Sequence, residues 1–167
     1  MDHQKVMNEL TKPISQELIN SAIPARFAFN GEDGFPRVVP MAFHWNGADI
    51  VMCTTTNSLK YPALRKFPKV ALTIDTEGFP PRVLLIRGTA STEVVDGIPQ
   101  EYIDASHKIV PLAGHAEWEA GVRSLYPQMV RITIHPEWAR LQDFQTTLPQ
   151  NVEKLIRVAQ AAQGGSA

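Results

Sequence analysis

The stretch from Thr54 to Lys60, Thr-Thr-Thr-Asn-Ser-Leu-Lys, carries residue types that bind phosphate groups. Its hydroxyls follow an apolar, β-rich run, and Ser58 is a residue type that starts helices. N–H groups at a helix start attract anions, and hydroxyls add neutral donors. Lys60 supplies a positive charge, and Arg65 and Lys66 follow. Although the P-loop spacing Gly-x-x-x-x-Gly-Lys is absent, the pattern predicts a phosphate cradle. The alternative is a solvated cap before an ordinary basic helix face.

Local signals also predict the elements that position this turn. Asn46-Gly47 lies between two β-rich runs, residues 38–45 and 49–54. This pair favours a two-residue hairpin because both residues accept positive φ. The second strand of the hairpin therefore leads directly into the threonines, and a short helix is predicted over residues 59–67.

The rest of the chain shows two periodicities: period-two alternation, which is typical of strands, and 3.6-residue spacing, which is typical of helices. Further strands are predicted over residues 25–30, 70–75, 82–95, 130–134 and 138–144, and further helices over residues 15–22, 99–108, 115–126 and 149–162. A bend is expected near Gly88. Six or seven strands with hairpin connections indicate a mainly β fold with flanking helices, an antiparallel sheet that is closed or nearly closed on itself. A doubly wound fold would alternate strand and helix throughout.

Composition limits the class of protein. The 167 residues, 44% of them hydrophobic, suit one globular domain over residues 1–167. A formal net charge of −1 gives no reason to expect nucleic acid or a membrane as partner. Cys53 is the only cysteine and is expected to be a buried, unreactive thiol. Because no signal peptide or membrane-length apolar run is found, the predicted location is the cytoplasm.

No dedicated catalytic side chain stands out. The histidines lack the spacing of metal ligands, so no metal site is predicted. His44, Tyr61 and Arg87 are candidates for moving protons or polarising a substrate by residue type alone.

Several motifs together match the order and spacing of a known family. Residues 36–41, Pro-Arg-Val-Val-Pro-Met, precede the hairpin, and the Thr54–Lys60 stretch follows it. Residues 83–91, with Gly88, and residues 134–138, Ile-His-Pro-Glu-Trp, extend the match. Over roughly residues 15–148 the chain resembles the pyridoxamine 5'-phosphate oxidase-like split-barrel family, whose members use FMN or the deazaflavin F420.

The resemblance implies a homodimeric split barrel with cofactor sites between subunits. The strand containing Val38 would run along the ring through backbone groups, and the Thr54–Lys60 turn would hold the phosphate. Arg82 would lie near the ring or ribityl chain, and Trp138 would come from the partner subunit. The implied cofactor-binding residues are Val38, Val39, Pro40, Met41, Thr54, Thr55, Ser58, Lys60, Arg82 and Trp138.

Two departures narrow the implied activity. The oxidase that gives the family its name has basic residues where this chain has Phe43 and Leu59, and it has a C-terminal substrate signature of paired Arg and His that is absent here. Oxidation of pyridoxamine phosphate is therefore not expected. The resemblance implies hydride transfer between F420 or FMN, with F420 favoured, and a small conjugated substrate. The alternatives are a non-catalytic cofactor- or tetrapyrrole-binding protein and a barrel without a small-molecule ligand.

Overall fold

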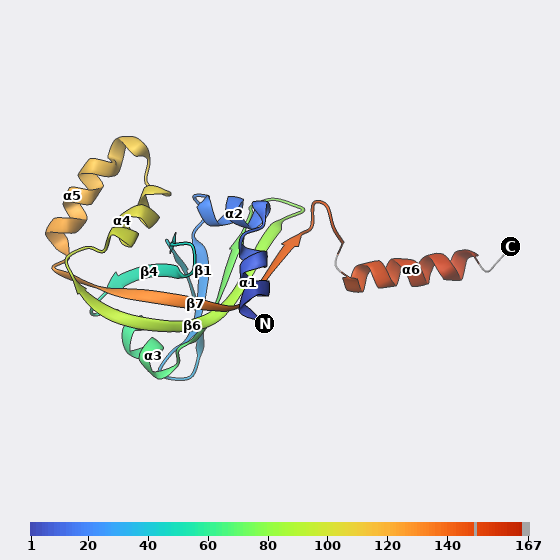
Figure 1. Cartoon of the computed structure of the whole chain (residues 1–167), viewed down its shortest axis with the longest axis horizontal. Helices are drawn as coiled ribbons and strands as arrows, with labels where there is room; N and C mark the ends of the chain where they lie inside the picture. Colours follow the sequence, from blue (N-terminus) through green and yellow to red (C-terminus); the bar gives the residue numbers. More distant parts are fainter. Residues whose placement is uncertain (149, 165–167) are drawn as a thin grey trace.

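The computed structural model describes residues 1–148 and 150–164. Within them, seven strands form one antiparallel sheet in the order β2-β1-β5-β6-β7-β4-β3 (Figure 1). The strands are β1 (Ala25–Asn30), β2 (Pro36–Met41), β3 (His44–Trp45), β4 (Ile50–Thr55), β5 (Lys69–Asp75), β6 (Arg82–Asp96) and β7 (Gln128–Asp143). The predicted mainly β, antiparallel architecture is confirmed.

The long strands β6 and β7 are shared by two parts of the sheet. The first half of β6 pairs with β5, which leads on to β1 and β2. The first part of β7 pairs with β4, which leads on to β3. The sheet wraps around an apolar core whose largest fully buried side chains include Phe27, Phe43 and Met52. This arrangement is the split barrel that the motifs predicted.

A β-bulge joins what the sequence predicted as two final strands. Arg87 pairs with Trp138, but Gly88 pairs with Pro136, so Glu137 is an extra residue on β7. The bulge accommodates the proline, and β7 continues where a break at residues 135–137 was expected. A Cβ at Gly88 would lie 2.2 Å from the carbonyl oxygen of His135, which explains the glycine at the predicted bend.

The predicted hairpin forms between β3 and β4, but its loop consists of the four residues 46–49, since Trp45 pairs with Ile50, and not of the two residues expected. Asn46 does not take the positive φ that a two-residue turn would require. Gly47 has a φ of +99°, and the side-chain oxygen of Asn46 accepts hydrogen bonds from the N–H groups of Ala48 and Asp49. The predicted strand over residues 38–45 is, however, divided into two strands, because residues 42–43 interrupt it between β2 and β3 and bury Phe43.

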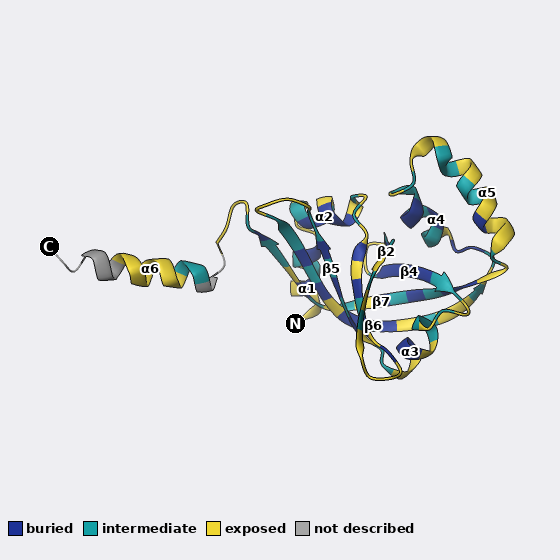
Figure 2. Ribbon diagram, turned by 180° about the vertical axis from the view of Figure 1, so that it is seen from behind, coloured by how far each residue is buried: buried dark blue, intermediate teal, exposed yellow. Residues whose placement is uncertain are grey.

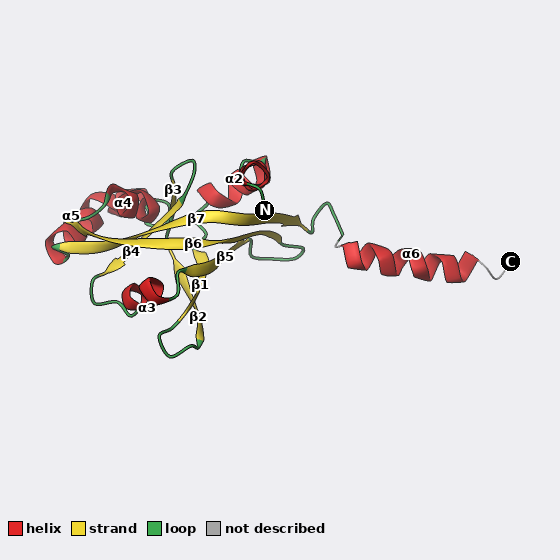
Figure 3. Cartoon of the chain, turned by 60° about the horizontal axis from the view of Figure 1, so that its bottom comes forward, coloured by secondary structure: helices red, strands yellow, loops and turns green. Residues whose placement is uncertain are grey.

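The described residues contain six α-helices, of which α3 and the α4–α5 pair lie on opposite sides of β6 and β7 (Figures 1 and 3). Their bounds are α1 (His3–Leu10), α2 (Pro13–Asn20), α3 (Lys60–Lys66), α4 (Gln100–His107), α5 (His115–Leu125) and α6 (Gln150–Gly164). Exposed residues predominate on α6, which extends away from the sheet (Figure 2). Pro149, where the predicted last helix begins, lies outside the described residues. No helix within residues 1–148 and 150–164 is both long and apolar enough to cross a bilayer.

The N-terminal helices differ from the expectation of one helix at 15–22. Helix α1 was not predicted because its apolar stripe is short, consisting of Val6 and Leu10, which are both buried. The Asp2 side chain caps this helix by accepting the N–H of Gln4. Helix α2 starts two residues earlier than predicted, with Pro13 in its first turn.

Candidate functional site

The predicted cradle is a compact turn between β4 and α3. Thr54 and Thr55 end β4, and the Thr55 hydroxyl donates to the side-chain oxygen of Asn57 at 2.7 Å. The Ser58 hydroxyl oxygen lies 3.3 Å from the Lys60 backbone nitrogen and 3.5 Å from Lys60 Nζ. The structure therefore places Ser58 and Lys60 in contact and Thr55 beside Asn57 on the same turn, whereas Thr54 precedes them on β4, where consecutive side chains point to opposite faces.

Charge and hydroxyls, more than backbone donors, define this cradle. The N–H groups of Ser58 and Tyr61 already donate to the carbonyls of Thr55 and Ser58, and the Lys60 N–H donates to the Ser58 hydroxyl. The ammonium of Lys60 has no carboxylate within ion-pair distance in the part of the chain that the structure describes. With hydroxyls beside an uncompensated ammonium, the donor set suits a phosphate.

Helix α3 adds positive charge behind the cradle. Its sequence, Lys-Tyr-Pro-Ala-Leu-Arg-Lys, contains three basic residues and no acidic ones. Ala63 and Leu64 are buried and fix the helix on the barrel, whereas Arg65 and Lys66 stay exposed. The anchored helix therefore holds Lys60 in place while it presents a local basic surface.

The predicted ring-binding strand, β2, lies at one edge of the sheet. It pairs with β1 alone among the described strands, so one row of its backbone groups is left without a ladder. Val39 and Met41 pack on the core, while Val38 and Pro40 face outward. An edge strand with a free backbone row can bind a ligand through main-chain groups, as the resemblance implied.

A cross-strand row connects β2 with Trp138. Val38 pairs with Ala28, Ala28 with Ala71, Ala71 with Arg87, and Arg87 with Trp138. The guanidinium carbon of Arg87 lies 4.3 Å from the centre of the Trp138 ring. Two of the predicted site residues, Val38 and Trp138, thus share the outer face of the sheet, at opposite ends of one row.

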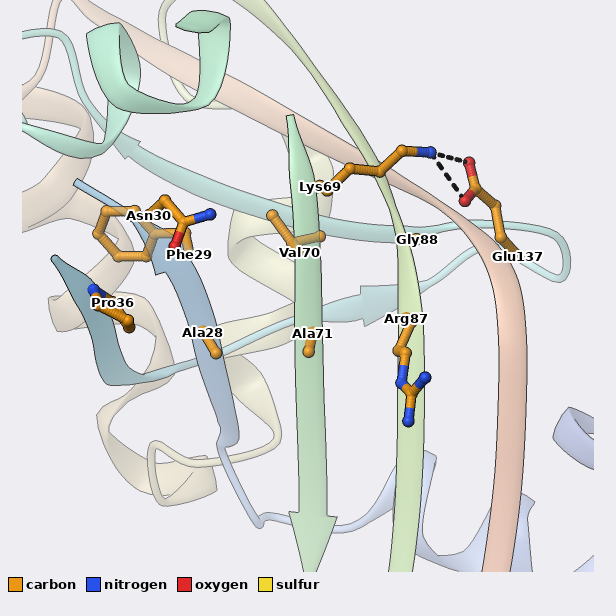
Figure 4. Close-up of a pocket in the computed structure, with 10 residues that line it drawn as sticks. All are labelled: Ala28, Phe29, Asn30, Pro36, Lys69, Val70, Ala71, Arg87, Gly88 and Glu137. Atoms are coloured by element: carbon orange, nitrogen blue, oxygen red, sulfur yellow. Dashed lines mark hydrogen bonds and ion pairs between the residues drawn. The ribbon is translucent and has the colours of Figure 1, made fainter. Parts of the chain in front are cut away.

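The middle of this row forms a hollow of about 380 Å³ (Figure 4). Its lining residues are Ala28, Phe29, Asn30, Pro36, Lys69, Val70, Ala71, Arg87, Gly88 and Glu137. Lys69 Nζ lies 2.9 Å from both carboxylate oxygens of Glu137, and the Thr89 hydroxyl also bonds this carboxylate. The hydrogen bond from Thr89, followed by that from Lys69, lowers the pKa of Glu137. The hollow is therefore a small-residue floor with charged groups on its rim.

Arg82 lies away from both the cradle and the hollow. It is the first residue of β6, whereas Val94, near the other end of that strand, pairs with Val130 beside Thr54. The distance along the strand is about 40 Å at 3.3 Å per residue. Arg82 lies 3.0 Å from Glu17 and 3.6 Å from Asp143, and the pKa of Asp143 is lowered mainly by its hydrogen bond from Thr146. Its part in cofactor binding stays a prediction.

The remaining candidates occupy ordinary environments. His44 Nδ1 lies 3.8 Å from Asp104, and Tyr61 lies under the guanidinium of Arg65. Burial raises the pKa of the Cys53 thiol to about 12, as expected for an unreactive cysteine. No group of three or more potential metal ligands is found within the described residues.

Sequence reasoning named Arg87 as a candidate by residue type but missed the alanine floor of the hollow and the Lys69–Glu137 pair on its rim. Ala28 and Ala71 are outward-facing positions on separate strands, and no local pattern indicates that they are neighbours. Lys69 and Glu137 are far apart in the chain and meet only through the sheet and its bulge. The one available signal was Gly88, which marked the bend.

The fold defines a split-barrel protein, and comparison with known families agrees. The family model described as pyridoxamine 5'-phosphate oxidase matches residues 12–143. The chain therefore belongs to the pyridoxamine 5'-phosphate oxidase family. No curated protein matches it.

Several solved structures share the fold. An F420 reductase is 24% identical over 75% of this chain and 94% of its own, with a TM-score of 0.58. The conserved hypothetical protein Rv2991 from Mycobacterium tuberculosis is 19% identical over 90% of both chains, with a TM-score of 0.56. HutZ, the heme storage protein from Vibrio cholerae, is 17% identical over 78% of this chain and 92% of its own, also with a TM-score of 0.56. An F420 reductase and a heme storage protein therefore share this architecture.

Proposed function

We propose that this protein is an oxidoreductase that transfers hydride between F420 or FMN, with F420 favoured, and a small conjugated substrate. The observation that carries the proposal is the uncompensated Lys60 ammonium beside the Ser58 hydroxyl at the end of β4. Both cofactors carry a phosphate group, and this donor set fits one. The F420 reductase of the same fold supports the preference for F420. The lone, buried Cys53 is consistent with the proposed cytoplasmic location.

Each part of the chain has a defined task in this proposal. When bound, the cofactor ring supplies the hydride chemistry. Thr54, Thr55, Ser58 and Lys60 hold the phosphate, and the free backbone row of β2 holds the ring. The outward-facing Val38 and Pro40 would exclude water from one side of the ring. No side chain is assigned as a general acid or base.

A homodimer would complete the site. β2 is an edge strand with an exposed Val38, whose side chain is 65% accessible, and such an edge favours coverage by another chain. Arg82 and Trp138 are distant from the cradle along their own chain, so they would reach the cofactor of a partner subunit. Sedimentation with and without cofactor tests the dimer, and a protein that stays monomeric in both conditions contradicts it.

Cofactor titration tests the function directly. Lys60→Ala is expected to weaken binding of FMN and F420 by about 1.5–3 kcal/mol, the usual contribution of a charged hydrogen bond. Lys5→Ala, on the exposed face of α1, is the matched control and should bind as the wild type does. The dissociation constants are measured by the absorbance change of each cofactor. If wild type binds neither cofactor, or if Lys60→Ala binds as tightly, the proposal fails.

One observation supports the alternative, a tetrapyrrole-binding protein. His135 Nδ1 lies 2.7 Å from an Asp49 carboxylate oxygen, and a carboxylate-held imidazole is a common axial ligand arrangement. HutZ shares the fold. A hemin titration in which His135→Ala removes the absorbance change, together with no oxidation of bound reduced cofactor by any acceptor, would favour this alternative.

A further inference from the structure

Arg87 lies at the rim of the hollow and has no anionic partner in the part of the chain that the structure describes. Its guanidinium stacks on Trp138, at 4.3 Å from the ring centre, and no carboxylate within the described residues lies at ion-pair distance from it. The other two charged groups of the hollow, Lys69 and Glu137, neutralise each other. One full positive charge therefore faces the hollow uncompensated.

The stack also orients the guanidinium. A planar cation that lies over an aromatic face keeps its N–H edges free, and those edges match both oxygens of a carboxylate. Holding the group in advance reduces the conformational entropy lost when an anion binds. By contrast, Arg26 on the same face is already engaged, with Nε 2.8 Å from Asp75.

The floor beside Arg87 is flat and leaves room for a planar group. Ala71 lies on β5, next to β6, and Ala28 lies on β1, the strand beyond β5 (Figure 4). Larger side chains at these two positions would fill the space. A volume of about 380 Å³ falls within the range of small-molecule sites, roughly 300–1,000 Å³. A small aromatic or conjugated ligand fits this volume.

We propose that the hollow binds a substrate that carries a carboxylate on a planar, conjugated group, with Arg87 as the anion-binding residue and Ala28 and Ala71 as the floor. This inference rests on the proposed function in one respect: it takes the bound anion to be part of the substrate. It predicts that the site is specific for acidic substrates.

The test compares a charged and a neutral probe of the same shape. 2-Naphthoate and 2-naphthalenemethanol are titrated calorimetrically into the full-length protein, with and without FMN, while ¹⁵N NMR follows the Arg87 Nε–H and the Trp138 indole N–H. Wild type is expected to bind naphthoate at least about tenfold more tightly than the alcohol, and Arg87→Gln is expected to abolish that preference. Arg87→Lys should keep part of it. Arg26→Gln, the ion-paired control, should keep all of it.

Each contrary outcome has a separate meaning. Equal affinity for the two probes, no naphthoate binding, or unchanged naphthoate binding by Arg87→Gln overturns the inference. If Arg87→Gln weakens FMN or F420 binding by as much as it weakens naphthoate binding, Arg87 binds an anion of the cofactor. This result overturns the assignment to the substrate. A shift of the monomer–dimer equilibrium in Arg87→Gln without naphthoate binding shows that a second copy covers this face. Failure of the Lys60 titration alone would remove the proposed function and leave the hollow's anion preference intact.

Discussion

The cradle and the hollow both present a cation without a carboxylate partner among the described residues, but they are built in opposite ways. Lys60 lies on a short segment, close to a hydroxyl two residues away. Arg87 lies on a rigid sheet and is held by Trp138 from the neighbouring strand. The cradle is a local structure with a compact ammonium, and the hollow is a preorganised surface with a planar guanidinium.

The difference indicates that the two regions can be altered separately. Helix α3, about 10 Å long at 1.5 Å per residue, lies between Lys60 and the start of β5 at Lys69. No side chain bonds both regions within the described residues. Effects of substitutions in the two regions should therefore be additive, as for sites that share no partners.

The largest effect is expected from a substitution at the β-bulge that distorts the hollow. Gly88→Ala would place a Cβ 2.2 Å from the His135 carbonyl oxygen, so the strands must shift. We expect a loss of about 2–3 kcal/mol in unfolding free energy and loss of naphthoate binding, because Arg87 and Trp138 move apart. Urea denaturation and the naphthoate titration measure the two effects. Cofactor affinity should change little.

Gly121→Ala is the matched control. Gly121 lies inside α5, and no atom would come within 4 Å of its added Cβ. Alanine is a better helix former than glycine by about 1 kcal/mol, so this variant should be at least as stable as the wild type. Equal stability of the two variants would show that the close approach at Gly88 has no role in holding the hollow.

A smaller effect is expected in the cradle. Ser58→Ala removes the oxygen that accepts the Lys60 N–H and lies beside its ammonium. Cofactor binding should weaken by about 1 kcal/mol, with naphthoate binding unchanged. Ser124→Ala, at an exposed serine of α5, is the control. Loss of naphthoate binding in Ser58→Ala would contradict the separation of the two regions.

The smallest effect is expected from a change in the charge of the hollow at Glu137. Above the ordinary pKa of a glutamate the Glu137 carboxylate neutralises Lys69, and its stabilising contribution is lost only as pH falls through its lowered pKa. Glu137→Gln frees Lys69 at neutral pH, so 2-naphthalenesulfonate should bind more tightly, by no more than a few fold. This probe stays charged in acid.

The pH series provides the check. In the wild type, naphthalenesulfonate affinity should rise as pH falls through the lowered pKa of Glu137, whereas Glu137→Gln should lack this rise. Cofactor affinity at the cradle should not follow the same curve, because Lys60 has no carboxylate partner within the described residues. An identical pH profile in both proteins would show that the Lys69–Glu137 pair does not set the charge of the hollow.

Helices, strands and turns whose structure depends on interactions between residues close in the sequence could be predicted. Asn46-Gly47 specified the hairpin between β3 and β4 because the turn chemistry is local. The outward and inward positions of β1 and β5 followed from alternation, and α3 from its start and stop residues. Helix α1 was missed because its apolar stripe of Val6 and Leu10 is short, so that packing on the sheet adds more to its stability than the local Asp2 cap indicates.

The sequence by itself determined a mainly β chain, a turn at Thr54–Lys60 with its charge, and a glycine at a required bend. Only the tertiary structure decided that β7 continues through Pro136, that Arg82 engages Glu17 and Asp143, and that Arg87 faces a hollow. The physical reason is that a turn is held by bonds between near neighbours in the chain. A cross-strand row depends on register, and a shift of one residue would turn its side chains to the other face.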